Sequence, residues 1–474
     1  MVATTLIIYL IVLLGIGIWA QRRIGNTEDF HLAGRRMGPV VAALSASASS
    51  SSAWTLLGMS GAAYAWGLQA VWLIPAVVSG FFINWVFIAP KLQPASHANQ
   101  ALTLVEFLAR GTDAVTERRM RTLGALIILF CFTFYVASQF QAAGTAISTA
   151  LPVSATLAMV VGAAIVIIYV FLGGFWAASV TDALQGLMML VVALILPVVA
   201  LVAVGGPVAL WEGMGALGDP SLVRLVDQPG LLLAMVFVAG LFGIGLGYPG
   251  QPHVVNRFMA LESADQVPFA RNVALTWATL MYIGMVLLGW SGRVLLPELA
   301  DSESVLLQLA VDLLPAVLGG LITGGVLAAI MSTSDSQLLV AGSAVSHDLR
   351  RGRISLAMDR LVIVVLGIAA VLLALFFPAS IFDRVLFAWQ ALGNAFGPLL
   401  IVLLFFGPVA AGHRLAAMLG GFALTVIISF DYFPDAPGNA VERLVPFFLS
   451  LLIAWLGYRR GVSGAGRIAR KVPP

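Results

Sequence analysis

Apolar residues dominate this chain in long segments that are separated by short polar stretches. Each segment has about the 20 residues that an α-helix needs to cross the hydrocarbon core of a bilayer. The loops between segments are too short for a separate soluble domain. The pattern predicts thirteen membrane-spanning helices, at residues 3–20, 38–66, 69–90, 123–149, 155–172, 181–204, 230–250, 270–294, 308–336, 357–377, 385–407, 413–430 and 444–458.

Two of the predicted helices contain residues that interrupt a helix. The first interruption, at residues 45–54, is a run of serines and alanines, and serine hydroxyls compete for backbone hydrogen bonds. The second, at residues 243–252, is rich in glycine and proline. Lipid tolerates interrupted backbone only where protein or a water-filled cavity surrounds it. Interruptions at corresponding places in two halves of a chain indicate the binding site of a secondary transporter.

Composition agrees with a membrane protein over the whole length. Of 474 residues, 60% are hydrophobic and only 10% are charged, whereas soluble proteins have about 25% charged residues. The single cysteine, Cys131, lies in an apolar segment and excludes an internal disulfide. A net charge of +3 gives no reason to expect nucleic-acid binding. The first apolar segment is long and has no basic region before it, so we expect no cleavable signal peptide.

Basic residues are concentrated in the loops on one side of the predicted helices. The positive-inside rule assigns that side to the cytoplasm, which puts the N-terminus outside and the C-terminus inside. Only four arginines remain on the opposite side: Arg224, Arg293, Arg384 and Arg443. The loops assigned to the cytoplasm include Arg35, Arg110, Arg119, Arg257, Arg351 and Arg414.

This orientation makes the two interrupted helices cross in opposite senses. We therefore predict an all-α polytopic membrane protein with one transporter domain over residues 1–474. Inverted repeats at 38–204 and 230–407 would each begin with an interrupted helix. A leading helix at 3–20, two trailing helices within 413–458 and a cytoplasmic tail at 459–474 complete the prediction.

Asp182 and Asp335 are the only acidic residues that the pattern places within a helix without an obvious path to water. Charges inside a membrane are costly and by default mark an ion or substrate pathway, although both side chains could instead reach interfacial water. Hard cations bind hydroxyl, carbonyl and carboxylate oxygens. Asp335 stands in a cluster of hydroxyl side chains: Ser332, Thr333, Ser334 and Ser336.

Other polar side chains without an evident partner lie near the interruptions. They are Tyr135, Gln139, Tyr248, Gln251, Gln390 and Asn394. Gln390 and Asn394 are four residues apart and share a helix face. For each of these side chains, hydrogen bonding between helices is as well supported as substrate contact. Half-helix N-termini at an interruption favour an anionic group such as a substrate carboxylate.

The sequence does not favour an enzyme. Its five histidines are widely spaced, and it has no zinc-ligand spacing, catalytic carboxylate pair or phosphate-binding loop. A membrane sensor with a degraded transport site is an alternative from another class. The short tail after Arg460 leaves little room for an output domain.

A set of short motifs runs through the chain. They are Gly34-Arg-Arg-Met-Gly-Pro39, Ala43-Leu-Ser-Ala46 with Trp54, Ala101-Leu-Thr-Leu104, Gly173-Gly-Phe175 with Thr181-Asp182, Gly245-Leu-Gly-Tyr248, Gly250-Gln-Pro-His253, Arg257-Phe-Met-Ala260, Met331-Ser-Thr333 and Phe396-Gly-Pro398. Together they resemble the sodium:solute symporter family, closest to its sodium/proline branch. The resemblance implies a leucine-transporter-like core of five-plus-five inverted repeats, with one helix before it and two after it.

The resemblance also implies ligand positions. The common sodium site would use backbone carbonyls of Ala48, Ser51 and Ala329 and the hydroxyls of Ser332 and Thr333. A second sodium, found in some members, would lie at Asp182, Ser332, Asp335 and Ser336. The substrate would contact Ser50, Ser52, Trp54 and Thr55 on the first interrupted helix, with Tyr135, Tyr248 and Pro252 across the cavity. Gln139, Gln390 and Asn394 complete the candidate substrate residues.

Three positions depart from the proline branch of that family. Ser50 replaces an aspartate, Ile244 replaces a tryptophan, and Asp335 replaces a neutral residue. Other branches lack the first aspartate and remain sodium-coupled, so Ser50 does not exclude sodium. The exchanged pocket residues argue against assuming that proline is the substrate.

We therefore expect a sodium-coupled symporter of the bacterial inner membrane that imports proline, another amino acid or a small carboxylate by alternating access. Sodium would favour the outward-facing state by binding it more tightly than the inward-facing state. Proton coupling, with Asp335 as the proton-binding group, is the closest alternative. The expected partners are sodium, the solute and the lipid bilayer, and a monomer would suffice for transport.

Overall fold

The computed structural model describes residues 32–349, 356–377, 379–432 and 436–469, together with residues 4, 8, 11, 12 and 15. The predicted leading helix at 3–20 therefore lies almost entirely outside the described residues. Helices joined by turns make up the described part of the chain. Its only β pairing is a bridge between Met37 and Leu261, in which Met37 N–H donates to the Ala260 carbonyl (3.1 Å) and Glu262 N–H to the Met37 carbonyl (3.3 Å).

The helices follow one another with short connections. The first half contains α3 (Pro39–Ser50), η2 (Trp54–Gly58), α4 (Met59–Trp66), η3 (Gly67–Trp72), α5 (Leu73–Phe82), η4 (Ile83–Ile88), α6 (Ala89–Asn99), α7 (Leu104–Ala109), α8 (Ala114–Ala150) and α9 (Ala155–Val204). The second half contains α10 (Pro207–Ala216), α11 (Leu231–Leu246), η6 (Tyr248–Gly250), α12 (Pro252–Ala260), α13 (Val267–Leu295), η8 (Ser302–Ser304), α14 (Val305–Leu313), α15 (Ala316–Ser343), η9 (Ala344–Leu349), α16 (Leu356–Phe376), α17 (Ile381–Phe405), α18 (Ala411–Ile427), η10 (Ile428–Tyr432) and α19 (Ala440–Ala469).

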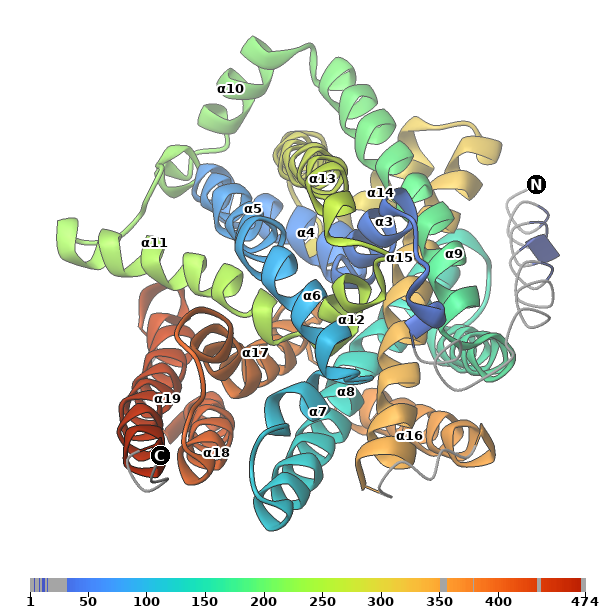
Figure 1. The fold of residues 1–474 in the computed structure, drawn as a ribbon. Helices are drawn as coiled ribbons and strands as arrows, with labels where there is room; N and C mark the ends of the chain where they lie inside the picture. Colours follow the sequence, from blue (N-terminus) through green and yellow to red (C-terminus); the bar gives the residue numbers. More distant parts are fainter. Residues whose placement is uncertain are drawn as a thin grey trace.

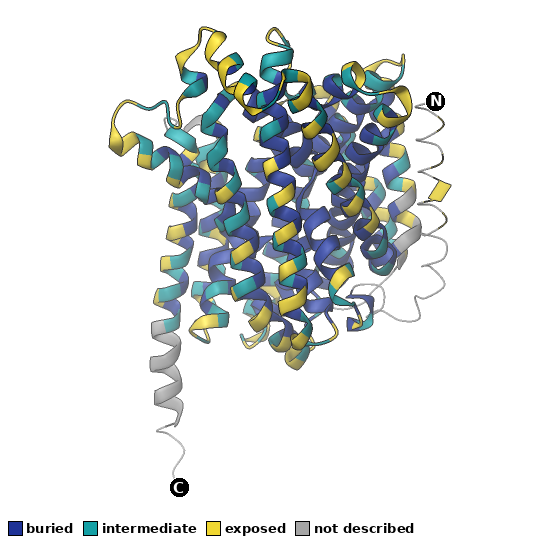
Figure 2. Ribbon diagram, turned by 90° about the horizontal axis from the view of Figure 1, so that it is seen from above, coloured by how far each residue is buried: buried dark blue, intermediate teal, exposed yellow. Residues whose placement is uncertain are grey.

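The helices form a bundle with a buried centre and an apolar outer surface. In the described part of the chain, ten helices are long and apolar enough to cross a membrane, and Pro39–Ser50 and Ala155–Ile168 are shorter apolar helices. Figure 2 shows buried residues in the centre, with exposed ones toward the edge and the ends. Large apolar side chains such as Val202 and Leu231 are exposed on the periphery, as expected where lipid covers a protein. The exact number of crossings remains a prediction.

Both predicted helix interruptions are confirmed. α3 ends at Ser50, Ser51 has non-helical backbone angles (φ −111°, ψ 72°), and the chain becomes helical again with the π-helical turn η2. α11 ends at Leu246, and α12 begins at Pro252. Proline suits the first turn of a helix because its missing N–H would have no intrahelical partner there.

The bounds of several predicted helices differ from those of the structure. The segment predicted at 308–336 is divided into α14 and α15, because Pro315 disfavours helical geometry in the residue before it. The structure also extends the helix predicted to start at residue 181 back to a kink at Gly174, which has a positive φ of 64°. Glycine adopts that angle without the steric cost that other residues have.

α3 and α12 lie near the centre, where α3 packs on α9, α13 and α15, whereas α11 runs inward from one side of the bundle and packs on α5 and α19 (Figure 1). α18 and α19 pack on each other and on α17 at one side of the bundle. Backbone meets backbone where the second interruption packs on α17. A Cβ added at Gly250 would lie 2.6 Å from the Gly393 carbonyl oxygen. Small residues allow such close approach between membrane helices.

Candidate functional site

The C-terminal end of α3 presents carbonyl oxygens to the middle of α15. Carbonyls in the last turn of a helix lack intrahelical partners and carry partial negative charge. Ser332 Oγ on α15 lies 3.3 Å from the Ala48 carbonyl oxygen and 3.2 Å from that of Ala329. Thr333 Oγ1 is buried and has no hydrogen-bond partner among the described residues. All the predicted ligand residues of the common sodium site, Ser51 included, are buried.

This set of atoms has the chemistry that a sodium ion requires. It consists of neutral carbonyl and hydroxyl oxygens, of the kind that hard cations bind. Among the described residues, no cluster of three or more histidine, cysteine or acidic side chains could hold a transition metal. The unpartnered Thr333 hydroxyl gives the group an oxygen that a bound ion would satisfy.

Side chains of α8 hold the interruption in the first helix. Ser52 Oγ accepts hydrogen bonds from Trp54 N–H (3.1 Å) and from the Tyr135 hydroxyl (3.3 Å). Gln139 Oε1 accepts one from Ala53 N–H (3.0 Å). These bonds pair amides that an unbroken helix would have satisfied internally. The predicted site residues Ser52, Tyr135 and Gln139 are thereby brought together.

Tyr282 on α13 was not among the predicted site residues, yet it connects several of them. Its hydroxyl lies 3.1 Å from Ser51 Oγ, 3.4 Å from Thr55 Oγ1 and 3.5 Å from the Tyr248 hydroxyl. Tyr282 is fully buried. A lone tyrosine in the apolar segment 270–294 is the same kind of signal that Tyr135 gives. The hydroxyl cluster, defined as Ser50, Ser51, Ser52, Thr55, Tyr135, Tyr248 and Tyr282, surrounds the first interruption.

Two predicted substrate residues point toward other helices. Gln390 Nε2 donates to the Gly243 carbonyl (3.2 Å), and Asn394 Nδ2 donates to Thr425 Oγ1 on α18 (2.9 Å). These contacts match the alternative role of hydrogen bonding between helices. Gln251, at the second interruption, likewise donates to the carbonyls of Gly247 and Trp389. The geometry therefore does not bring Gln390 or Asn394 into the hydroxyl cluster.

The predicted location of Arg257 is wrong. It was assigned to a cytoplasmic loop, but it lies in α12 and is fully buried. Its guanidinium pairs with Asp182 (2.9 Å), a residue of α9 whose side chain is also fully buried. The same guanidinium donates to Ser45 Oγ (3.0 Å) and to Ser336 Oγ.

The second predicted sodium position therefore already contains a cation. Asp182 Oδ2 accepts from Ser45, Ser336 and Arg257. Asp335 Oδ1 accepts from Ser336 Oγ (3.1 Å), and Asp335 Oδ2 is buried without a partner among the described residues. This ion-pair cluster, made of Ser45, Asp182, Arg257, Asp335 and Ser336, connects both interrupted helices with α9 and α15. Removing one partner from such a buried pair leaves an uncompensated charge.

Aromatic side chains close the hydroxyl cluster from one face of the bundle, the upper face, at which α19 begins (top of Figure 2). A vestibule of about 530 Å³ opens there between α4, α8, η8 and the start of α17. At its base the Phe382 ring lies 5.6 Å from the Trp54 ring and 5.4 Å from that of Trp66. Trp54 is buried beneath this contact.

An ionic network lies on the opposite, lower face. Glu106 of α7 accepts hydrogen bonds from Leu102 N–H (2.8 Å), Arg110 (2.9 Å) and His347 Nε2 (3.1 Å). Burial acts to raise the pKa of Glu106, but the bonds from His347, Leu102 and Arg110 lower it to about 2. Arg121 of α8 pairs with Asp348 (3.3 Å) in the same network. The network joins α7, α8 and η9 on this face, and the residues of the hydroxyl cluster are all buried.

Glu303 connects the loop between α13 and α14, which lines the vestibule, with the start of α17. Its carboxylate accepts hydrogen bonds from Ile381 N–H (2.9 Å) and Phe382 N–H (2.7 Å), the first amides of that helix. A negative charge is favourable at a helix N-terminus. Burial nevertheless raises the pKa of Glu303 above its ordinary value of 4.5, and the nearby acids Asp301 and Asp383 add to the increase.

We expect Glu303→Ala to loosen this closure. Loss of a helix cap costs about 1 kcal/mol, which corresponds to roughly a fivefold larger open fraction. The raised pKa means that closure is most stable below pH 4.5 and loses this contribution as the pH rises through the pKa of buried Glu303. The rate at which an impermeant thiol reagent labels Thr55→Cys, a buried position of the hydroxyl cluster beneath the closure, measures the opening in a Cys131→Ser background.

The pH dependence provides the comparison for this variant. Lowering the pH from about 8 to about 5 should slow labelling more in the protein with Glu303 than in Glu303→Ala, because only the former gains a proton on closing. Glu298→Gln, an exposed acid of the same loop, should behave as the parent protein does. Equal pH profiles with and without Glu303 would contradict the assignment.

Comparisons with known proteins cover most of the chain. The model of the sodium:solute symporter family matches residues 30–421. The chain is 32% identical to the high-affinity proline transporter PutP of Bacillus subtilis (strain 168), covering 92% of this chain and 95% of the relative. It is 34% identical to the sodium/proline symporter of Escherichia coli (strain K12), covering 90% and 86%.

Solved structures show the same fold at low sequence identity. The substrate-bound outward-open state of a Na⁺-coupled sialic acid symporter has a TM-score of 0.79 and 18% identity and covers 97% of both chains. Mhp1, a nucleobase-cation-symport-1 family transporter in a closed conformation, has a TM-score of 0.56 and 14% identity, covering 92% of this chain and 96% of the other. The predicted leucine-transporter-like fold is thereby confirmed.

Proposed function

This chain belongs to the sodium:solute symporter family, and we propose that it imports a small organic solute together with sodium across the bacterial inner membrane by alternating access. Proline, another amino acid or a small carboxylate is the proposed solute. The names of its relatives support solute symport, and proline specificity rests on identities of about a third. The upper face would be the outer one.

The observation that carries this proposal is the oxygen cage between α3 and α15. The carbonyls of Ala48, Ser51 and Ala329 and the hydroxyls of Ser332 and Thr333 would hold the co-transported sodium. Ser332 already bridges the two helices through the Ala48 and Ala329 carbonyls. A cation there would strengthen the contact between α3 and α15. Sodium and solute affinities are then linked reciprocally, because each ligand favours the arrangement that the other binds.

The solute would lie beside the interruption of the first helix. The hydroxyl cluster supplies donors and acceptors there, and Trp54, Tyr135 and Tyr248 supply aromatic walls. Tyr248 contacts the Trp389 ring at 4.5 Å, so α17 carries part of this wall. Ser50, whose hydroxyl bonds back to the Ser47 carbonyl (3.0 Å), brings no charge to the pocket. A small solute with few polar groups fits such a lining.

We propose that one sodium moves in each cycle, because Arg257 supplies the cation at the second position. Two sodium ions, one of them held by Asp182, Ser332, Asp335 and Ser336, would require the guanidinium to leave those oxygens. Asp335→Asn should therefore leave the Hill coefficient for sodium near 1 in reconstituted vesicles. A Hill coefficient near 2 that falls in Asp335→Asn would support the second sodium instead.

Uptake of radiolabelled amino acids and small carboxylic acids into vesicles, with and without a sodium gradient, tests the function directly. We expect accumulation of one solute class that depends on sodium and stops when the gradient is dissipated. Uptake that persists without sodium and follows an imposed pH gradient would favour proton coupling instead. The buried, unpartnered Asp335 Oδ2 is the observation that supports proton coupling as the second candidate.

A further inference from the structure

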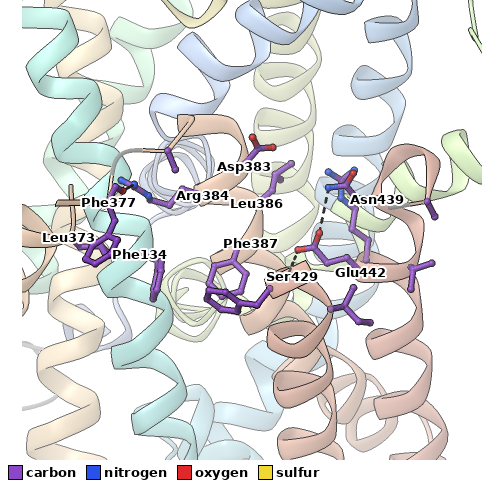
Figure 3. Close-up of a pocket in the computed structure, with 16 residues that line it drawn as sticks. Phe134, Leu373, Phe377, Asp383, Arg384, Leu386, Phe387, Ser429, Asn439 and Glu442 are labelled. Carbon is purple, nitrogen blue, oxygen red and sulfur yellow. Dashed lines mark hydrogen bonds between the residues drawn. The ribbon is translucent and has the colours of Figure 1, made fainter. Parts of the chain in front are cut away.

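A second cavity, of about 800 Å³, opens on the upper face beside the vestibule. α8, the end of α16, the start of α17, η10 and the start of α19 line it (Figure 3). It shares Ala379 and Asp383 with the vestibule but contains no residue of the hydroxyl cluster. Whatever binds in this cavity would therefore be distinct from the solute beside the first interruption.

Aromatic rings form one wall of this side cavity. The Phe387 ring lies 5.3 Å from Phe134 and 5.8 Å from Phe430, in edge-to-face arrangements. Phe377 lines the cavity next to Leu373. An apolar wall of this kind receives the hydrocarbon part of a ligand and leaves orientation to a few polar groups.

Two buried arginines line the same cavity, and neither forms a salt bridge with a described acidic residue. Arg384 is 6% exposed and donates to Gln141 Oε1 (3.2 Å) and to the Phe377 carbonyl. Arg443 is 3% exposed and donates to the carbonyls of Gly438 (3.0 Å) and Gly240 (3.4 Å). No carboxylate of a described residue lies within 4 Å of either guanidinium. The nearest acids, Glu442 and Asp383, act on Arg443 only from a longer distance. A buried cation that forms no close ion pair is costly in a membrane protein and by default marks a functional position.

Arg414 shows what a purely structural buried arginine looks like in this fold. It also has no described acidic residue within 4 Å, but its guanidinium donates to the carbonyls of Val409, Leu108 and Arg110. It does not line the side cavity. Arg384 and Arg443 differ because they stand at the wall of an open space that an anion can enter.

Acidic groups complete the lining. Glu442 accepts hydrogen bonds from Ser429 Oγ (2.8 Å) and Asn439 Nδ2 (3.5 Å), and Asp383 lies at the start of α17. Figure 3 shows Arg384 and Glu442 on opposite sides of the cavity, with Phe387 between them. A pure anion would meet repulsion from these acids, whereas a molecule with both charges would not.

We propose that this side cavity is a second ligand site for a zwitterion with an apolar body. Its anionic group would bind Arg384, its ammonium group Glu442 on the opposite side, and its apolar body the phenylalanine wall between them. An apolar α-amino acid from solution and the headgroup of phosphatidylethanolamine share this chemistry. Since α17 also carries Phe382, a bound zwitterion would act on the helix whose ring covers Trp54 at the base of the vestibule.

Protection of a cysteine tests the site without transport. The protein with Cys131→Ser and Val441→Cys is placed in phosphatidylcholine nanodiscs in sodium-free choline buffer, and the rate of thiol labelling is followed. L-phenylalanine should slow labelling at millimolar concentration, whereas 3-phenylpropionate and phenethylamine, which each lack one charge, should protect at least tenfold less well. Leu225→Cys, on an exposed loop away from the cavity, should show no protection.

Variants assign the protection to the cavity. Arg384→Gln should raise the phenylalanine concentration for half-protection about tenfold or more, since it removes a charged partner. Glu442→Gln, less buried and less demanding of the fold, should weaken protection by phenylalanine but not by 3-phenylpropionate. Ser332→Ala with Thr333→Ala should leave protection intact. Retained protection would separate this site from the proposed sodium site.

A separate experiment tests whether the bound zwitterion is a lipid headgroup. If the headgroup is the occupant, phosphatidylethanolamine in the nanodisc should protect Val441→Cys without added phenylalanine, and Arg384→Gln should remove that protection. Protection by either zwitterion that depends on Arg384 or Glu442 supports the proposal. No protection by either, or equal protection by all three small probes, would overturn it.

Discussion

Ser332→Ala combined with Thr333→Ala should abolish sodium-dependent uptake. The two hydroxyls are the only side-chain oxygens of the proposed sodium cage, and the remaining ligands are backbone carbonyls. Each lost hydroxyl ligand should cost about 1–3 kcal/mol, so the pair should raise the sodium concentration for half-maximal uptake by about thirtyfold or more. Initial uptake rates in vesicles over a range of sodium concentrations measure this shift.

Two further variants separate the cage from general damage to α15. Ser334→Ala changes a buried hydroxyl on the same helix that is outside the proposed cage, so sodium half-saturation should stay within about twofold. Thr333→Ser keeps the hydroxyl oxygen and should retain most of the parent protein's affinity for sodium. If Ser332→Ala with Thr333→Ala has normal sodium half-saturation, the ion binds elsewhere.

Arg257→Gln should destabilise the protein strongly. It leaves Asp182 and Asp335 buried without a cation, and breaking a buried ion pair on one side costs about 3–5 kcal/mol. The expected result is a large decrease in the thermal unfolding temperature of the purified protein, followed by intrinsic tryptophan fluorescence. Transport should be lost as well, because the cluster connects both interrupted helices.

A double variant tests whether the pair itself is responsible. Asp182→Asn with Arg257→Gln replaces both charges by neutral groups that can still form hydrogen bonds. The double variant should be more stable than Arg257→Gln alone, since effects of contacting partners are not additive. A double variant whose loss equals the sum of the two single losses would show that the charges do not act as a pair.

The sequence predicted the features that depend on local chemistry. Serines in the first interruption and glycines and prolines in the second weaken a helix wherever they occur, and both interruptions are found at the expected places. Ser332 also lies beside the Ala48 carbonyl, as the family resemblance implied, although sodium binding there is untested. These features follow from residues that are near one another in the chain or match a known motif.

Features that depend on the neighbours of a helix were missed. Arg257 was assigned to a loop because arginines near helix ends usually mark the cytoplasmic side, and nothing local reveals a partner 75 residues away. Gln390 and Asn394 share a face of α17, but other helices surround α17. Gln390 therefore bonds to α11 and Asn394 to α18. The side cavity is lined by residues from several elements, so no pattern within one segment predicts it.

The bridge between Met37 and Leu261 has a mechanical consequence. It ties the strand of chain before α3 to the end of α12, and Arg257 on α12 also reaches Ser45 on α3. Two contacts at different depths therefore hold α3 and α12, the lower halves of the two interrupted helices, together. A swing that admits water from below would carry them as one rigid piece, with its hinges at residues 51–53 and 247–251. A covalent crosslink between α3 and α12 should consequently leave turnover intact.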